Sequence, residues 1–166
     1  MNTNRTATIL LVDDNDNDVF ITRKAFDRAN LPVSLHHVEN GEECLKFLRK
    51  ESPYDEAPNP DLILLDLDMP VMNGQQVMEA IFNDTDLRHL PVIFLTNTST
   101  PETVQEMYKL RCNSYYTKPA DFNEYKKVLD SIYDHWLSIV VLPEQQGGDG
   151  GSINGQNPGD PPCGGR

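Results

Sequence analysis

Five short apolar runs divide the chain, and a segment with the spacing of an amphipathic helix follows each of them. The runs are Ala7–Val12, Ser34–Val38, Leu62–Leu65, Val92–Leu95 and Ser114–Thr117. The first, third and fourth are continuously apolar, which is typical of strands that are buried on both faces. Between runs, apolar residues recur every three or four positions, as at Ile21 and Ala25, and this spacing predicts helices. The pattern therefore predicts a (βα)₅ chain.

Alternation of this kind favours parallel strands joined by right-handed crossovers, with helices on both faces of the sheet. We expect an α/β fold with a doubly wound, parallel, five-stranded sheet in the flavodoxin-like strand order 2-1-3-4-5. Cap signals support two of the helices. Thr100-Pro101-Glu102 has the pattern of a helix start, and Asp121 and Glu124 have the spacing of a capping box.

The composition changes near Pro143. Before it, the last helical stripe runs on through Trp136 into an arm over residues 136–143. After it, residues 144–166 hold eight of the ten glycines and almost no apolar residues. A segment of this kind buries too little apolar surface to offset its ordering entropy. We therefore expect one domain over residues 1–143 and a flexible Gly/Pro-rich tail over residues 144–166.

Composition narrows the possible partners. The 166 residues carry a net charge of −12 without a basic patch, which argues against nucleic-acid binding. No apolar run approaches the roughly 20 residues of a membrane span, and the N-terminus does not have the pattern of a secretory signal. The three cysteines form neither a disulfide framework nor a metal-binding pattern. We expect a cytoplasmic protein without a membrane segment.

Polar side chains stand where the apolar runs stop. Asp13 and Asp14 follow the first run, Asp66 follows the third, Thr96 ends the fourth and Lys118 follows the fifth. In a parallel sheet the carboxyl ends of the strands lie along one edge, where ligands bind. These five residues should therefore converge on one site.

Three carboxylates close together need a cation to remain ionised, and Mg²⁺ is the hard divalent ion that suits oxygen ligands. We expect Mg²⁺, which Mn²⁺ can replace. An aspartate in such a site can act as a nucleophile towards phosphorus and form an aspartyl-phosphate. The Lys118 ammonium and the Thr96 hydroxyl would then stabilise charge on the phosphoryl oxygens.

Four segments resemble the receiver domain of two-component response regulators over roughly residues 7–137. They are Leu11-Val12-Asp13-Asp14, Leu64-Leu65-Asp66-Leu67-Asp68-Met69-Pro70, Leu95-Thr96 and Lys118-Pro119. The resemblance implies that Asp66 is the phosphoacceptor and that Thr96 and Lys118 hold the phosphoryl group. It also implies a metal site made of Asp13, Asp14, Asp66 and the backbone carbonyl of Asp68. Tyr115 matches the aromatic switch position, acting together with Thr96, and Lys118–Pro119 is a candidate cis bond.

A narrower resemblance links the chain to single-domain regulators that are paired with bacterial phytochromes. It rests on the long polar loop before Leu62, on Asp86–Pro91, on Asn113–Tyr115 and on Trp136–Pro143. It implies a sensor histidine kinase as partner, with a bacteriophytochrome as one candidate, or a phosphotransfer protein. It also implies a homodimer through the last helix and the arm. The phosphodonor histidine should come from the partner, since His36 and His37 lie in the second run, away from the site.

Two other functions remain open at this point. Asp66-Leu67-Asp68 also resembles the Asp-x-Asp of haloacid-dehalogenase-type phosphatases, although the acid pair here stands upstream. The chain could also be a phosphorylation-independent interaction module. We expect a phosphoacceptor signalling domain rather than a separate enzyme. Asp68 stands where the narrower family often has asparagine, so we expect the lifetime of the phosphorylated form to differ.

Overall fold

One parallel sheet forms the centre of the molecule, in a computed structural model that describes residues 5–29, 31–139 and 141–143. Its strand order is β2-β1-β3-β4-β5, which confirms the predicted order 2-1-3-4-5. The strands are β1 (Ala7–Val12), β2 (Val33–Val38), β3 (Leu62–Leu65), β4 (Val92–Thr96) and β5 (Ser114–Thr117). The first and last residues of each strand lie within one residue of the predicted run. The agreement is close because the apolar residues of these runs pack in the core of the fold.

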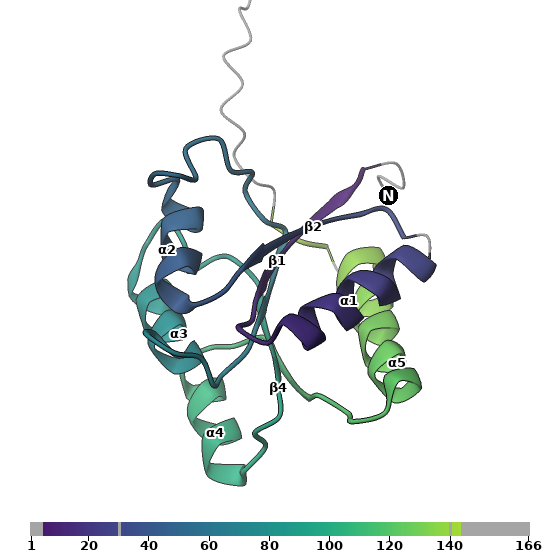
Figure 1. Cartoon of the computed structure of the whole chain (residues 1–166). Helices are drawn as coiled ribbons and strands as arrows, with labels where there is room; N and C mark the ends of the chain where they lie inside the picture. The colour runs from purple at the N-terminus through teal and green to yellow at the C-terminus, as the bar shows by residue number, and fades with distance from the viewer. Residues whose placement is uncertain (1–4, 30, 140, 144–166) are drawn as a thin grey trace, which may run out of the picture.

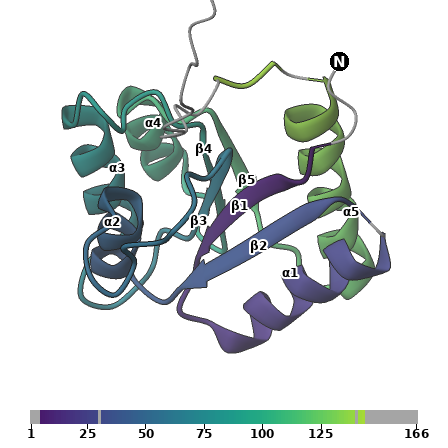
Figure 2. The same ribbon diagram turned by 90° about the horizontal axis from the view of Figure 1, so that it is seen from above.

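Helices cover both faces of the sheet, as a doubly wound fold requires. They are α1 (Asp16–Arg28), α2 (Gly41–Arg49), α3 (Gly74–Asn83), α4 (Pro101–Lys109) and α5 (Phe122–Ile132). Figure 1 shows α1 and α5 together on one side of the strands and α2, α3 and α4 on the other, and Figure 2 shows the same division from above. The predicted (βα)₅ fold class is confirmed.

The helix starts follow local chemistry. The Thr100 hydroxyl accepts the backbone N–H of Thr103 next to Pro101, as the sequence predicts. At α5 the Asp121 carboxylate accepts the backbone N–H of Glu124 at 3.0 Å. The two-way capping box forms instead at the start of α3, where Asn73 and Gln76 each accept the other's backbone N–H. This box anchors the loop that follows Asp66.

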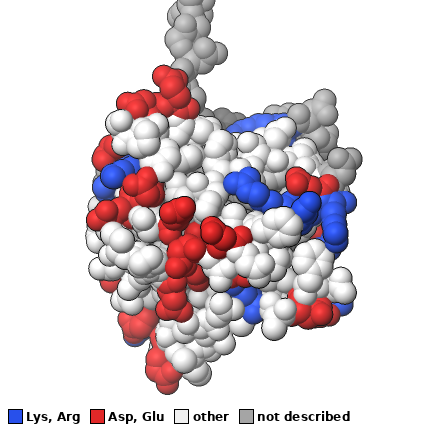
Figure 3. Space-filling view, in the orientation of Figure 1, with Lys and Arg blue, Asp and Glu red and all other residues white. Residues whose placement is uncertain are grey.

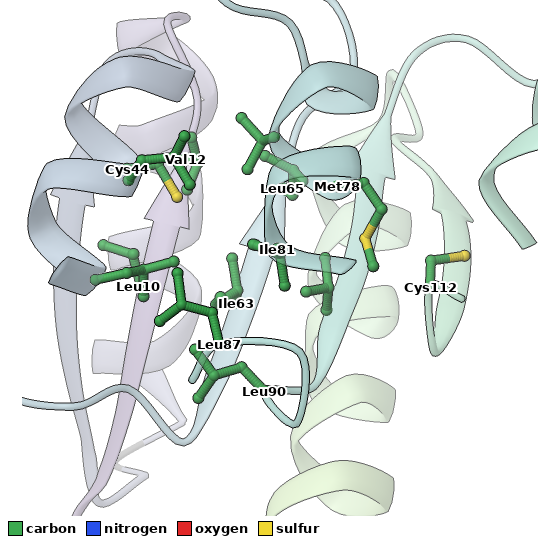
Figure 4. Close-up of a cluster of buried hydrophobic side chains, with 14 of the residues drawn as sticks. Leu10, Val12, Cys44, Ile63, Leu65, Met78, Ile81, Leu87, Leu90 and Cys112 are labelled. Carbon is green, nitrogen blue, oxygen red and sulfur yellow. The ribbon is translucent and has the colours of Figure 1, made fainter. Parts of the chain in front are cut away.

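The core has two parts, one on each face of the sheet. Alternate residues of β1 divide between them: Leu10 and Val12 belong to the part beneath α2 and α3, and Ile9 and Leu11 to the part beneath α1 and α5. Figure 4 shows the first part, with Cys44 of α2 beside Val12. Each fully buried aliphatic side chain contributes roughly 1.5–3 kcal/mol, so these two layers hold the strand ends in place.

The last helix does not continue as the regular stripe that the sequence predicts. After α5 the chain widens into a π-helical turn, η1 (Tyr133–Ile139). In such a turn the hydrogen bonds span five residues, so periodicity of the ordinary helix cannot foresee it. Tyr133, Trp136 and Leu137 of this turn pack against the core part beneath α1 and α5. The predicted tail, residues 144–166, lies outside the described residues.

Two further observations concern the described part of the chain. Its one cis peptide bond is Ser52–Pro53, so the expectation of a cis bond at Lys118–Pro119 was wrong, and that bond has the trans form that most proline bonds prefer. Among the described residues, no helix is both long and apolar enough to span a membrane.

Candidate functional site

The predicted site residues lie at the carboxyl edge of the sheet because neighbouring strands end level with one another. Val12 pairs with Leu65, so the residues that follow them, Asp13 and Asp66, lie side by side. The Asp66 N–H donates to the Val12 carbonyl at 2.9 Å. On the other side of β3, the Lys118 N–H donates to the Thr96 carbonyl at 2.8 Å. The sheet thus brings all the strand ends together.

Three carboxylates form the centre of the site. Carboxylate oxygens of Asp13, Asp14 and Asp66 all lie within 4.8 Å of one another. Asp13 and Asp66 are buried, with 1% and 7% of their surface exposed, whereas Asp14 is exposed to solvent. Oxygen ligands at this spacing with one open side suit a hard divalent cation that keeps part of its water shell. The donor set therefore fits the metal that the sequence predicts.

Lys118 supplies the positive charge of the site. Its side chain is 2% exposed, and its Nζ lies 2.6 Å from Asp13 Oδ2 and 3.7 Å from Asp66 Oδ2. Burial alone would lower the pKa of this ammonium. The hydrogen bonds to Asp13 and Asp18 and the charge of Asp66 outweigh burial, so the pKa of Lys118 is raised and it stays charged.

The two buried carboxyls hold their protons more strongly than usual. Burial raises the pKa of Asp66 to about 6; the Lys118 charge opposes this rise and the Asp13 charge adds to it. Burial also raises the pKa of Asp13, although the hydrogen bond from Lys118 acts in the opposite direction. One ammonium does not balance the group of carboxylates around it. A further cation in the site would restore the balance.

Two neighbours of the site were not identified from the sequence. Asp18 follows no apolar run, so the strand-end pattern does not single it out, yet its Oδ2 lies 2.9 Å from Lys118 Nζ. His37 was expected to lie away from the site, which was wrong, because its Nε2 lies 2.8 Å from the Asp13 carbonyl oxygen. That nitrogen must carry a proton to donate. Both contacts depend on tertiary packing, and no sequence spacing signals them.

Thr96 and Tyr115 are linked to the site through the loop after β4. Thr96 is fully buried, and its hydroxyl accepts the Thr98 N–H at 3.4 Å. The Tyr115 hydroxyl donates to the Thr98 carbonyl, and the Thr98 hydroxyl donates to the Asp68 carboxylate. Burial and the charges of Asp68 and Asp66 raise the pKa of Tyr115 to about 12. A displacement of this loop would therefore reach both Asp68 and Tyr115.

The loop between Asp66 and α3 is tightly constrained. A Cβ on Gly74 would lie 2.4 Å from the Asp66 carbonyl oxygen and 2.8 Å from Leu67 Cα, so only glycine fits there. The Gly74 N–H donates to the Leu67 carbonyl at 2.8 Å. Earlier in the loop, Val71 has a φ of 68° although it is a β-branched residue. Close packing at Gly74 fixes the backbone that carries Asp66.

The fold and these contacts define a class of protein: a doubly wound sheet that presents an acid cluster, a buried lysine and a buried threonine at its carboxyl edge. Residues 9–130 match the family described as the response regulator receiver domain. The chain belongs to this family. Its site is therefore that of a receiver domain of the kind found in two-component systems.

One curated relative and two solved structures are similar to this chain over most of its length. Response regulator Rcp1 of Synechocystis sp. is 32% identical over 135 residues, which are 81% of this chain and 92% of that protein. The crystal structure of the phosphorylated cyanobacterial phytochrome response regulator RcpA superimposes with a TM-score of 0.79 at 33% identity, covering 83% of this chain and 99% of that chain. The Mn²⁺-bound form of Rcp1 gives a TM-score of 0.78 at 31% identity, with 83% and 99% coverage.

These findings decide between the alternatives left open by the sequence. The chain is a receiver domain of a signalling family. Neither a haloacid-dehalogenase-type phosphatase based on Asp66 and Asp68 nor a phosphorylation-independent interaction module is favoured. A divalent metal agrees both with the carboxylate cluster and with the Mn²⁺-bound relative.

Proposed function

We propose that this chain accepts a phosphoryl group on Asp66 from the phosphohistidine of a partner kinase or phosphotransfer protein. The observation that carries the proposal is the meeting of three carboxylates within 4.8 Å with a buried ammonium 3.7 Å from Asp66. The reaction is expected to depend on Mg²⁺, with Mn²⁺ as a substitute. Asp13, Asp14, Asp66 and the backbone carbonyl of Asp68 would hold the ion.

The transfer exchanges one bond to phosphorus for another. A carboxylate oxygen of Asp66 attacks phosphorus, the P–N bond to the donor imidazole breaks, and the imidazole nitrogen takes a proton from solvent. The Lys118 ammonium and the Thr96 hydroxyl bind phosphoryl oxygens and stabilise their charge. When bound, the divalent ion would neutralise carboxylate and phosphoryl charge so that two anions can approach. The same site would later release the phosphoryl group to water.

The phosphorylated chain would signal because the surface formed by the loop after β4 and by Tyr115 changes. Thr96 bound to a phosphoryl oxygen would draw the loop after β4 towards Asp66. Tyr115 would follow, since its hydroxyl donates to the Thr98 carbonyl and its ring stacks on Phe94 with centroids 5.6 Å apart. New contacts of this kind shift the balance between two conformations, and a partner that binds one of them senses the shift.

A light-sensing kinase is the partner class that the relatives favour. RcpA is described as a phytochrome response regulator, and Rcp1 is similar to this chain over most of its length. We extend this to a bacteriophytochrome or related sensor histidine kinase as the donor here. The cytoplasm is the compartment in which we place this exchange.

A homodimer through the last helix and the arm over residues 136–143 is part of the proposal. Val141 is 94% exposed, so an apolar side chain of the arm is available for contact. Light scattering should give the mass of a dimer for the full chain, before or after phosphorylation, and the mass of a monomer for a chain without residues 138–166. A monomer mass in all samples would rule out this dimer.

The central test is direct labelling. The protein is incubated with acetyl phosphate and Mg²⁺, and its mass is measured. Wild type should gain one phosphoryl group, and Asp66→Asn should gain none. Chelation of the metal should abolish the gain. Absence of an adduct on wild type would disprove the proposal, and rapid turnover of small phosphate esters would indicate a phosphatase instead.

A further inference from the structure

Asp18 is an acidic residue of the site that the proposed reaction does not yet use. It lies in the first turn of α1, and its carboxylate reaches Lys118 Nζ at 2.9 Å. Its side chain is 16% exposed, so the charge is largely removed from water. Asp16 lies in the same turn, but it is exposed and forms no ion pair with Lys118. Position in the helix alone therefore does not explain the contact of Asp18.

Buried hydrogen bonds fix the place of Asp18. The Thr22 hydroxyl lies 2.8 Å from the Asp18 carbonyl oxygen and donates to it. The same hydroxyl lies 3.2 Å from the Tyr125 hydroxyl of α5. Thr22 and Tyr125 are 0% and 2% exposed. This contact between α1 and α5 holds the backbone of the first turn in position and keeps the Cα of Asp18 within side-chain reach of Lys118.

The contacts of Lys118 place its ammonium nearer to α1 than to the phosphoacceptor. It donates to Asp13 at 2.6 Å and to Asp18 at 2.9 Å, whereas Asp66 Oδ2, at 3.7 Å, is beyond hydrogen-bond distance. An ammonium has three N–H donors, and two of them are used here. We propose that Asp18 is a positioning residue that holds the Lys118 ammonium on the α1 side and competes for it with a phosphoryl group on Asp66.

The inference rests on the proposed function, because a phosphoryl oxygen is the competing acceptor. Asp18→Asn keeps the shape of the side chain and removes its charge, so its hydrogen bond to Lys118 becomes weaker. The ammonium is then freer to turn to an acceptor on Asp66. Beryllofluoride, a phosphoryl analogue, should bind this variant in Mg²⁺ about three- to tenfold more tightly than wild type, as expected when one charge-assisted hydrogen bond is weakened.

The matched control is Asp16→Asn, which removes the same charge from the same helical turn. It should bind beryllofluoride like wild type, which separates the contact with Lys118 from the general effect of net charge. Asp18→Glu keeps the charge and should return the affinity towards wild type. Equal affinities for Asp18→Asn and Asp16→Asn, or weaker binding by Asp18→Asn, would overturn the proposal.

A second measurement needs neither metal nor phosphoryl group. Nuclear magnetic resonance on ¹⁵N-labelled lysine follows exchange of the Lys118 ammonium protons with water, and the signal is identified by its loss in Lys118→Arg. Exchange should be faster in Asp18→Asn than in Asp16→Asn, and equal rates would overturn the positioning role. If wild type takes neither label nor beryllofluoride, the proposed function fails, and these exchange rates still decide the role of Asp18.

Discussion

Burial raises the pKa of the Asp66 carboxyl to about 6 from an ordinary value of 3.8. The folded chain therefore binds this proton more tightly than the unfolded chain. The resulting stabilisation is complete below about pH 4 and is lost as the pH rises through 6. A shift of this size corresponds to roughly 2–3 kcal/mol. At pH 8, the charged Asp66 is thus a destabilising group in the metal-free protein.

We predict that Asp66→Asn is more stable than wild type at pH 8 in the presence of a chelator, by about 1–3 kcal/mol, because the amide carries no charge to bury. Urea denaturation at pH 5 and pH 8 measures this, and the difference should be smaller at pH 5. Added Mg²⁺ should reduce it at pH 8, since the ion stabilises the wild-type carboxylate. Asp68→Asn, an exposed change two residues away, is the control; a wild type at least as stable as Asp66→Asn would contradict the prediction.

Asp68 leads to a second prediction at this scale. Its exposed carboxylate accepts the Thr98 hydroxyl. We expect this negative charge to face the approach to Asp66. A carboxylate there can accept a proton from an attacking water molecule. Asp68→Asn should therefore lose its phosphoryl group several-fold more slowly than wild type, followed as the decay of the labelled mass after removal of the donor. Equal decay rates would refute the role of Asp68.

At the scale of elements, the loop from Asp66 to α3 stores strain close to the site. Val71 is 70% exposed and has a φ of 68°, a conformation that costs an ordinary L-residue roughly 1–2 kcal/mol. We predict that Val71→Gly raises the free energy of unfolding by about 0.5–1 kcal/mol, since strain relief exceeds the added entropy of glycine. Chemical denaturation measures the change.

The control for this change is Val141→Gly. Val141 is also exposed, and it lies outside this loop. The glycine there removes the same side chain away from Val71 and should leave stability unchanged or slightly lower. A loss of stability in Val71→Gly would show that this loop is not strained.

The elements also show where sequence reasoning succeeds. The strands β1, β3 and β4 were predicted because both faces of each strand are buried, as at Ile63 and Phe94, so their runs are continuously apolar. The strand ends then located Asp13, Asp66 and Lys118 without further information. The positive φ of Val71 could not be predicted, since branched residues disfavour it. The contact of Asp18 with Lys118 was missed because the packing of α1 on α5 creates it.

At the scale of the whole molecule, acidic side chains dominate the surface around the sheet's edge. Figure 3 shows them gathered across the middle of one face, with many of the basic side chains on the side of α1. The whole chain is acidic as well, with a net charge of −12. A field of this sign repels phosphate-bearing donors, so the proposed transfer to Asp66 would depend on Lys118 and on a bound cation at the site itself.

The predicted C-terminal boundary of the domain can be tested with shortened chains. The sequence predicts that the domain ends at Pro143. In the structure, Tyr133, Trp136 and Leu137 of η1 pack against the core part beneath α1 and α5. A chain that ends at Pro143 should therefore unfold with the same free energy as the full chain, within about 0.5 kcal/mol, the usual range of changes that remove no packing.

A chain that ends at Ile132 is the matched comparison, because it also loses η1. Removal of these three partly buried side chains should lower the free energy of unfolding by about 2–4 kcal/mol. Urea denaturation of the three chains measures both differences. If ending at Pro143 costs as much as ending at Ile132, residues 144–166 contribute to the folded domain and the predicted boundary is wrong. If neither truncation matters, the packing of η1 does not stabilise α5, and Tyr125 and Thr22 must hold that side of the site without it.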